Sequence, residues 1–255
     1  RLLPTSTVHR RKRTSRLLNM SSMKSPNGAT LSLGVGTVPF TIAEMLAKSD
    51  KEDLGCHTGT ISDCLPDALS SRETDGSQEG NQYRSCRMEP CKRQCGTLSV
   101  AERSPDLFYP ADVDYIHNPR NMEKLSNFIS INGGVQLDLM GQENAESVGT
   151  RQLSGTGGQL DFLEGLSFLR AGRVIFASIR PAKIRKGQLH SNILASIPAG
   201  STISAPRGLI QNVATEYGVA HLTGLTLKER AYAMISVAHP AFRDELKAYA
   251  DATFK

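Results

Sequence analysis

The sequence contains no tryptophan, and aromatic residues together make up only 5% of its 255 positions. It also has no apolar run close to the roughly 20 residues that a membrane-spanning helix needs. We therefore predict that the chain does not span a membrane. Hydrophobic residues make up 39% of the chain and charged residues 22%. This composition predicts a globular protein with a buried core, folded as one large or two modest domains.

Acidic residues are absent from the first 24 positions, which carry seven basic residues. Those seven exceed the net charge of +5, so the rest of the chain is slightly acidic and lacks the basic surface typical of nucleic-acid binding. Residues 1–26 are predicted to be a disordered basic leader. Their composition fits a mitochondrial transit peptide equally well. Because the sequence begins at Arg1 and not at a methionine, a fragment is a further alternative, and an arm for nucleic acid or an anionic membrane is a weaker one. We expect a cytoplasmic protein, with the mitochondrial matrix as the alternative.

The chain has five cysteines, an odd number that argues against a disulfide framework and fits a reducing compartment. Cys86, Cys91 and Cys95 lie within a polar stretch, residues 70–106, that has neither helical nor strand periodicity. A structural zinc site takes four ligands in closer pairs, so we expect no metal there. Residues 70–106 are predicted to be an irregular insert with little core.

Strand and helix patterns alternate on both sides of this insert. Residues 29–35 have the period of two that is typical of a strand, and glycines separate them from a helical pattern after Thr37. Further strands are predicted within 128–139, interrupted by Gly133 and Gly134, within 172–178 and after 212. This alternation predicts an α/β domain with a layered sheet over residues 27–255.

The C-terminal region is predicted to be helical. Thr226 and Glu229 have the spacing of a capping box. Four apolar residues follow at helical spacing and form one face: Ala231, Met234, Ile235 and Ala238. Pro240 ends this helix and can begin another, in which three residues are expected to face one way: Phe242, Leu246 and Tyr249.

The segment "VGTRQLSGTGGQLDFLEG", residues 148–165, holds five glycines. Gly155, Gly157 and Gly158 would let backbone N–H groups approach an anion or a carbonyl oxygen. Their spacing matches neither the dinucleotide-binding fingerprint nor the phosphate-binding loop. From these residues alone, a turn is the commoner explanation, and a ligand cradle stays open.

Seven motifs follow one another within residues 27–69 and 107–253: "GATLSLGVGTVP", "DLGCHTGTISD", "YPADVDYIHNP", "SINGGVQLDLMGQ", "SGTGGQLDFLEG", "VATEYGVAHLTGLTLKERA" and "AHPAFRDEL". In this order they resemble the C-terminal domain of the acetyl-CoA hydrolase/transferase family. That family includes the 4-hydroxybutyrate and butyryl-CoA:acetate CoA-transferases. The resemblance implies the α/β fold of the NagB/RpiA/CoA-transferase type. It also implies an enzyme that exchanges CoA between an acyl-CoA and a carboxylic acid such as acetate, with acyl-CoA hydrolysis as an alternative.

In the family, a glutamate attacks the acyl-CoA, forms an anhydride and then carries CoA as a glutamyl thioester. It follows a His-Thr or His-Ser pair, and in "HTGTISD" that position is Gly59. Glycine cannot form the anhydride. The resemblance therefore implies an impaired transferase, with a non-catalytic fragment or relic of the fold as the alternative. Cys56 is a chemically possible nucleophile, but we expect a structural thiol.

The resemblance also implies supporting residues. Glu216 and Asn132 are expected near the reacting centre; the alternatives are a structural hydrogen-bond acceptor at a strand end for Glu216 and a turn residue for Asn132. Lys183 could meet CoA phosphates together with two neighbouring basic residues, or all three could form a solvated charged loop. His57 and His239 are expected to be structural. Four residues of the glycine run are implied to contact the CoA substrate: Gly155, Gly157, Gly158 and Gln159.

Family chains are nearly twice as long as this one and carry an N-terminal α/β domain that forms half of the CoA cleft. The resemblance therefore implies that this chain works with such a domain, in cis or through a homo-oligomeric partner. Acyl-CoA and a small carboxylate are the implied substrates. No metal, nucleic acid or membrane is expected as a partner.

Overall fold

The computed structural model describes residues 27–34, 39, 42, 46, 49–52, 54–59, 111–125, 127–167, 174–185 and 187–255. The predicted leader, 1–26, and the predicted insert, 70–106, lie outside these residues. The described chain divides into two compact units. The N-terminal unit lies within residues 25–132 and 158–175, and the C-terminal unit comprises 133–157 and 176–255.

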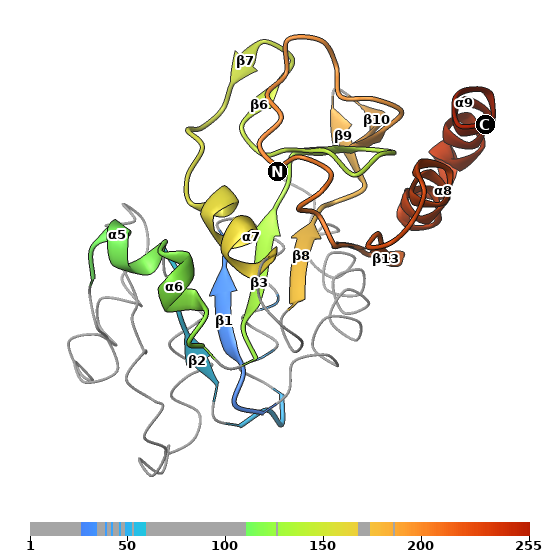
Figure 1. Cartoon of the computed structure of the whole chain (residues 1–255). Helices are drawn as coiled ribbons and strands as arrows, with labels where there is room; N and C mark the ends of the chain where they lie inside the picture. The colour runs from blue at the N-terminus through green and yellow to red at the C-terminus, as the bar shows by residue number, and fades with distance from the viewer. Residues whose placement is uncertain are drawn as a thin grey trace, which may run out of the picture. The chain divides into compact units, whose positions relative to one another are not determined.

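Three parallel strands form the centre of the N-terminal unit (Figure 1). The middle strand β1 (Thr30–Leu33) pairs with β2 (Gly55–Cys56) on one side and with β3 (Ile129–Gly133) on the other. The last three residues of β1 are all buried, as in a parallel sheet that is covered on both faces. Pro39, Ile42 and Leu46 are helical and buried, which agrees with the helix predicted after this strand.

Three further helices of this unit lie within the described residues: α5 (Val113–Ile116), α6 (Pro119–Met122) and α7 (Gln159–Ser167). Asn118 caps α6, because its side chain accepts a hydrogen bond from the N–H of Arg120. Helices α6 and α7 lie side by side (Figure 1). Gly165 of α7 makes this possible, since a Cβ there would lie 2.7 Å from the sulfur of Met122.

The C-terminal unit contains residues 176–178 of β8 (Val174–Ser178), together with β12 (Asn212–Thr215) and β13 (Gly218–His221). β12 pairs in parallel with β8 and forms an antiparallel hairpin with β13. A smaller sheet has the order β11 (Ile193–Leu194), β4 (Gln136–Asp138), β5 (Glu143–Asn144). Two more hairpins pair β6 (Ser147–Val148) with β7 (Arg151–Gln152), and β9 (Ala182–Arg185) with β10 (Gln188–Ser191).

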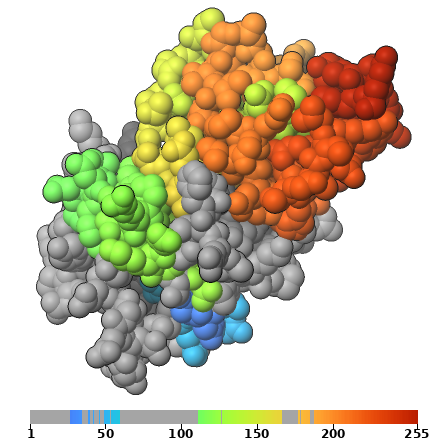
Figure 2. Space-filling model, in the orientation of Figure 1, coloured from blue at the N-terminus to red at the C-terminus, as the bar shows by residue number. Residues whose placement is uncertain are grey.

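The chain ends in α8 (Leu227–Val237), the 3₁₀ helix η3 (Pro240–Phe242) and α9 (Arg243–Thr253). Thr226 and Glu229 form the predicted capping box, with hydrogen bonds in both directions. The predicted apolar face of α8 is buried. The red atoms of α8 and α9 form neighbouring patches of the surface (Figure 2).

The face predicted for the last helix is only partly buried. Leu246 is buried together with Ala250, whereas Tyr249 is 39% exposed. The buried stripe therefore runs from i to i+4 along α9, and Tyr249 lies at its edge, where its ring meets Phe254. Within the described residues, no helix is both long and apolar enough to cross a membrane.

Candidate functional site

The carboxyl ends of the three parallel strands carry the candidate site of the N-terminal unit. Beyond β2, the N–H of His57 donates to the carbonyl of Leu31 at 2.9 Å, and the Thr58 hydroxyl donates to the carbonyl of Leu33 at 3.3 Å. These bonds extend the pairing with β1 as far as the residue before Gly59. In open α/β sheets, this edge is where ligands bind.

His57 is fully buried and tied to the backbone. Its Nε2 lies 2.6 Å from the carbonyl oxygen of Ile116, and because a carbonyl only accepts, this nitrogen carries the proton. Burial lowers the pKa of His57 below its usual value, the bond to Ile116 opposes this, and the nearby His117 lowers it further. His57 is thus a neutral structural residue, as its position in the sequence suggested.

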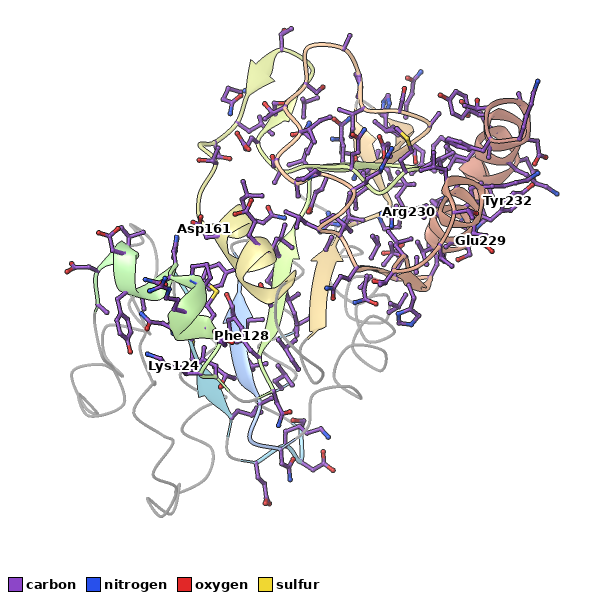
Figure 3. The ribbon with its side chains drawn as sticks, in the orientation of Figure 1. Lys124, Phe128, Asp161, Glu229, Arg230 and Tyr232 are labelled. Carbon is purple, nitrogen blue, oxygen red and sulfur yellow. The ribbon has the colours of Figure 1, made fainter. Side chains whose placement is uncertain are left out.

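His117 follows α5 directly and has a different environment. Its Nδ1 lies 2.8 Å from Oδ2 of Asp161, and its ring packs edge-on against Phe162, with 5.1 Å between the ring centroids. Asp161 lies in the first turn of α7 (Figure 3). The His117 side chain is 17% exposed and that of Asp161 47%, so the pair lies at the margin of the unit and not in its core.

Two glycines make room for the His117 ring. A Cβ on Gly59 would lie 2.8 Å from Nε2, and a Cβ on Gly158 would lie 2.1 Å from Cε1. Real Cβ atoms do not come this close to other atoms, so the ring can hold this position only because both residues lack a side chain. The structure thus brings together Gly59, the expected nucleophile position, and Gly158 of the glycine run, with His117 between them.

No local pattern in the sequence indicates this pairing. His117 and Asp161 stand in two of the family motifs, "YPADVDYIHNP" and "SGTGGQLDFLEG", but they are separated by 44 residues. No helical or strand period links residues so far apart. Their only shared signal is that each lies in a motif of the resemblance.

Asn132 lies at the end of β3, beside the loop after β1. It is buried, and its Nδ2 donates to the Ser130 hydroxyl at 3.0 Å. A Cβ on Gly34 would lie 2.9 Å from Oδ1 of Asn132. The turn alternative for Asn132 is wrong, because the residue belongs to the strand. Its expected role near the reacting centre stays a prediction.

The other glycines of the run differ from Gly158. Gly155 is exposed with open space around its Cα. Gly157 has φ +59, a left-handed conformation that favours glycine, and also faces open space. Gln159 is half-buried and begins α7. The run is thus partly a turn and partly a close contact with His117.

The remaining predicted site residues belong to the C-terminal unit. Glu216 is half-buried in the turn between β12 and β13. Lys183 lies in β9 opposite His190, which places it in a hairpin strand. His239 caps η3 and accepts a hydrogen bond from the N–H of Ala241, in agreement with a structural role.

No group of three or more potential metal ligands occurs among the described residues. Cys56, which was expected to be a structural thiol, is buried in β2. Cys86, Cys91 and Cys95 lie outside the part of the chain that the structure describes.

Residues 99–250 match the family model described as the acetyl-CoA hydrolase/transferase C-terminal domain. The chain belongs to this family. The resemblance inferred from the motifs is therefore confirmed. Members of this family share the α/β arrangement found here, as two solved relatives show.

RipA from Yersinia pestis superimposes with a TM-score of 0.79 and 29% identity, covering 94% of this chain and 52% of its own. A 4-hydroxybutyrate CoA-transferase from Porphyromonas gingivalis superimposes with a TM-score of 0.73 and 27% identity, covering 94% of this chain and 56% of its own. The predicted α/β fold of the CoA-transferase type is confirmed by these two structures.

Curated relatives carry both transferase and hydrolase names. The butyryl-CoA:acetate CoA-transferase of Anaerostipes caccae is 36% identical over 87% of this chain and 49% of its own length. The 4-hydroxybutyrate coenzyme A transferase of Clostridium kluyveri is 36% identical over 86% of this chain and 50% of its own length. An acetyl-CoA hydrolase of Yarrowia lipolytica is 29% identical over 87% of this chain and 40% of its own length. The chain thus spans about half the length of the curated relatives it matches, or less.

Proposed function

We propose that this chain forms the C-terminal, acyl-CoA-binding part of a CoA-transferase whose exchange step is impaired. Its relatives include enzymes named for CoA transfer and for acetyl-CoA hydrolysis. The observation that carries the proposal is Gly59, which stands at the expected nucleophile position on the ligand-binding edge of the parallel strands.

The proposed substrates are an acyl-CoA and a small carboxylate such as acetate. Transfer requires a carboxylate that keeps the energy of the thioester as an anhydride and then as a glutamyl thioester. Gly59 offers no such group. The glycines before α7 fit a supporting role, since their backbone N–H groups can approach a developing oxyanion. In this proposal, Glu216 and Asn132 support the site and Lys183 meets the CoA phosphates.

The structure also shows what a restored nucleophile would meet. The Cβ of a glutamate at position 59 would lie 2.8 Å from Nε2 of His117. The His117 ring is held by Asp161 and Phe162, so Gly59→Glu alone must displace a fixed ring. Replacement of His117 by alanine in the same chain removes this obstacle.

The test fuses the N-terminal half of the Anaerostipes enzyme to this chain and follows butyryl-CoA conversion in the presence of acetate. The unmodified fusion should form no glutamyl-CoA adduct detectable by mass spectrometry. Gly59→Glu with His117→Ala should form that adduct and produce acetyl-CoA, and Gly59→Glu alone should form less. Gly59→Gln with His117→Ala is the matched control, because it has the same size without the nucleophile. CoA transfer by the unmodified fusion would contradict the proposal.

A further inference from the structure

The pair His117 and Asp161 has the arrangement of a general base and the residue that orients it. We propose that Nε2 of His117 activates a water molecule for hydrolysis of the acyl-CoA thioester, with Asp161 as its positioning residue. This inference rests on the proposed function, because it takes the site beside Gly59 to hold the acyl-CoA. It goes further by assigning a reaction to the chain as it stands.

Asp161 determines which nitrogen of His117 can act as a base. An ionised carboxylate only accepts hydrogen bonds, so Nδ1, at 2.8 Å from Oδ2, carries the proton of the neutral ring. The lone pair then lies on Nε2. Acid–base histidines in hydrolases are held in the same way, by a carboxylate on the opposite nitrogen.

The second nitrogen points to the place where the chemistry is expected. Nε2 lies next to Gly59, 2.8 Å from where a Cβ would stand, and makes no hydrogen bond to any described residue. Gly59 has no side chain, so position 59 places no nucleophile of the chain between this nitrogen and an incoming carbonyl. We therefore assign the role of nucleophile to water, and the partial exposure of the ring admits it.

His57, the neighbouring histidine, provides an internal contrast. Its Nε2 is occupied by the carbonyl of Ile116, and the residue is fully buried. It therefore has no nitrogen placed to take a proton from water. Of the charged and titratable groups described around His117, Asp161 approaches from α7 and His57 from the segment after β2. Of the two histidines, only His117 combines a positioned lone pair with access to solvent.

The proposed reaction is balanced without any further reactant. The oxygen of water bonds to the thioester carbonyl carbon while Nε2 takes one proton from that water. The C–S bond then breaks, the electron pair leaves with the CoA sulfur, and the imidazolium returns its proton to the thiolate. The products are the free carboxylic acid and CoA with its thiol, and His117 is neutral again.

The experiment measures thiol release from acetyl-CoA by the full chain, alone and fused to the N-terminal half of the Anaerostipes enzyme. Hydrolysis should occur in at least one of these forms. His117→Ala and the larger His117→Gln should each lower kcat by about 10²- to 10⁴-fold, the usual contribution of a general base. His190→Ala is the matched control, because His190 is exposed in the β9–β10 hairpin, and it should leave the rate unchanged.

Two further readouts separate a chemical role from a structural one. Free imidazole should restore part of the hydrolysis in His117→Ala, because the two glycines leave a ring-sized space, and should not restore it in His117→Gln. Asp161→Asn should lower kcat with little change in KM, and Asp161→Glu should recover part of the loss. Absence of hydrolysis in both forms, or equal rates with and without His117, would overturn the inference.

Equilibrium binding of butyryl-CoA separates this inference from the proposed function. In one outcome, the fusion with Gly59→Glu and His117→Ala binds butyryl-CoA and transfers CoA, but the unmodified chain hydrolyses no acyl-CoA. This outcome would support the proposed function and refute the role of His117. Failure of both binding and transfer would refute the proposed function itself.

Discussion

At the scale of single residues, the contrast between Gly155 and Gly158 shows that the same residue type in one run serves different needs. Gly155 faces open space, whereas Gly158 contacts the ring of His117. The sequence predicted that glycine there served either a turn or a close approach. The structure shows a close approach to a side chain of the same chain, which no local pattern could reveal because His117 is 41 positions earlier in the sequence.

We predict that Gly158→Ala destabilises the protein through this contact. A Cβ at 2.1 Å from Cε1 must move the ring, and overpacking of this kind costs about 1–3 kcal/mol in the free energy of unfolding. The cost should shrink when His117 is also replaced by alanine, since the two residues are in direct contact. Urea unfolding of the single and double variants measures both values.

Gly155→Ala is the control for this prediction, because it changes the same residue type in open space. It should leave the free energy of unfolding within about 0.5 kcal/mol of the original value. If Gly158→Ala costs no more than Gly155→Ala, the His117 ring is not confined as described.

At the scale of elements, the sequence predicted the strands and helices that have a clear hydrophobic periodicity or a recognisable capping signal. The strand around Leu31 and the helix after Thr226 were found, because alternation and a capping box are local properties. The one-turn helices α5 and α6 were not predicted, since four residues are too few to show a helical period. The exposure of Tyr249 was also missed, because the partner helix decides which part of α9 is buried.

The capping box of α8 yields a prediction at this scale. Thr226→Ala removes the hydroxyl that accepts from the N–H of Glu229, and loss of such a cap costs about 1 kcal/mol in the free energy of unfolding. Lys228→Ala, an exposed change in the same turn, should cost clearly less. Thermal or urea unfolding at neutral pH measures the difference.

Acid should reduce the effect of Thr226→Ala. Hydrogen bonds from the backbone N–H and then the hydroxyl of Thr226 lower the pKa of Glu229. A carboxyl with a lowered pKa stabilises the folded state above its unfolded pKa, about 4.3, and loses this contribution as pH falls through the folded value. The difference between the two proteins should therefore be smaller below pH 4 than at pH 7. An equal difference at both values would contradict this role of Glu229.

At the scale of the whole molecule, the motifs predicted the family and the fold, and the family model with two solved relatives confirmed both. The arrangement around His117 could not be predicted in the same way. It depends on the ends of β2, α5 and α7 meeting in one place, which is a property of the folded unit. The motifs contain the residues, but only the packing of these elements brings His117 between Gly59 and Gly158.

The last prediction concerns the acyl group that the site accepts. The chain spans about half the length of its relatives, and the family resemblance implies an N-terminal domain that forms half of the CoA cleft. We therefore expect the chain alone to bind acetyl-CoA, butyryl-CoA and free CoA with similar affinity, within about threefold, because its contacts would be mainly with the CoA moiety.

Fusion to the N-terminal half of the Anaerostipes enzyme should change this result. A second wall around the acyl chain adds apolar contact of roughly 0.8 kcal/mol for each buried methylene group, so butyryl-CoA should bind at least tenfold more tightly than acetyl-CoA in the fusion. Isothermal titration calorimetry on both forms, with free CoA as the common reference, tests the prediction. Strong discrimination between the two acyl-CoAs by the chain alone would show instead that its own residues form the acyl pocket.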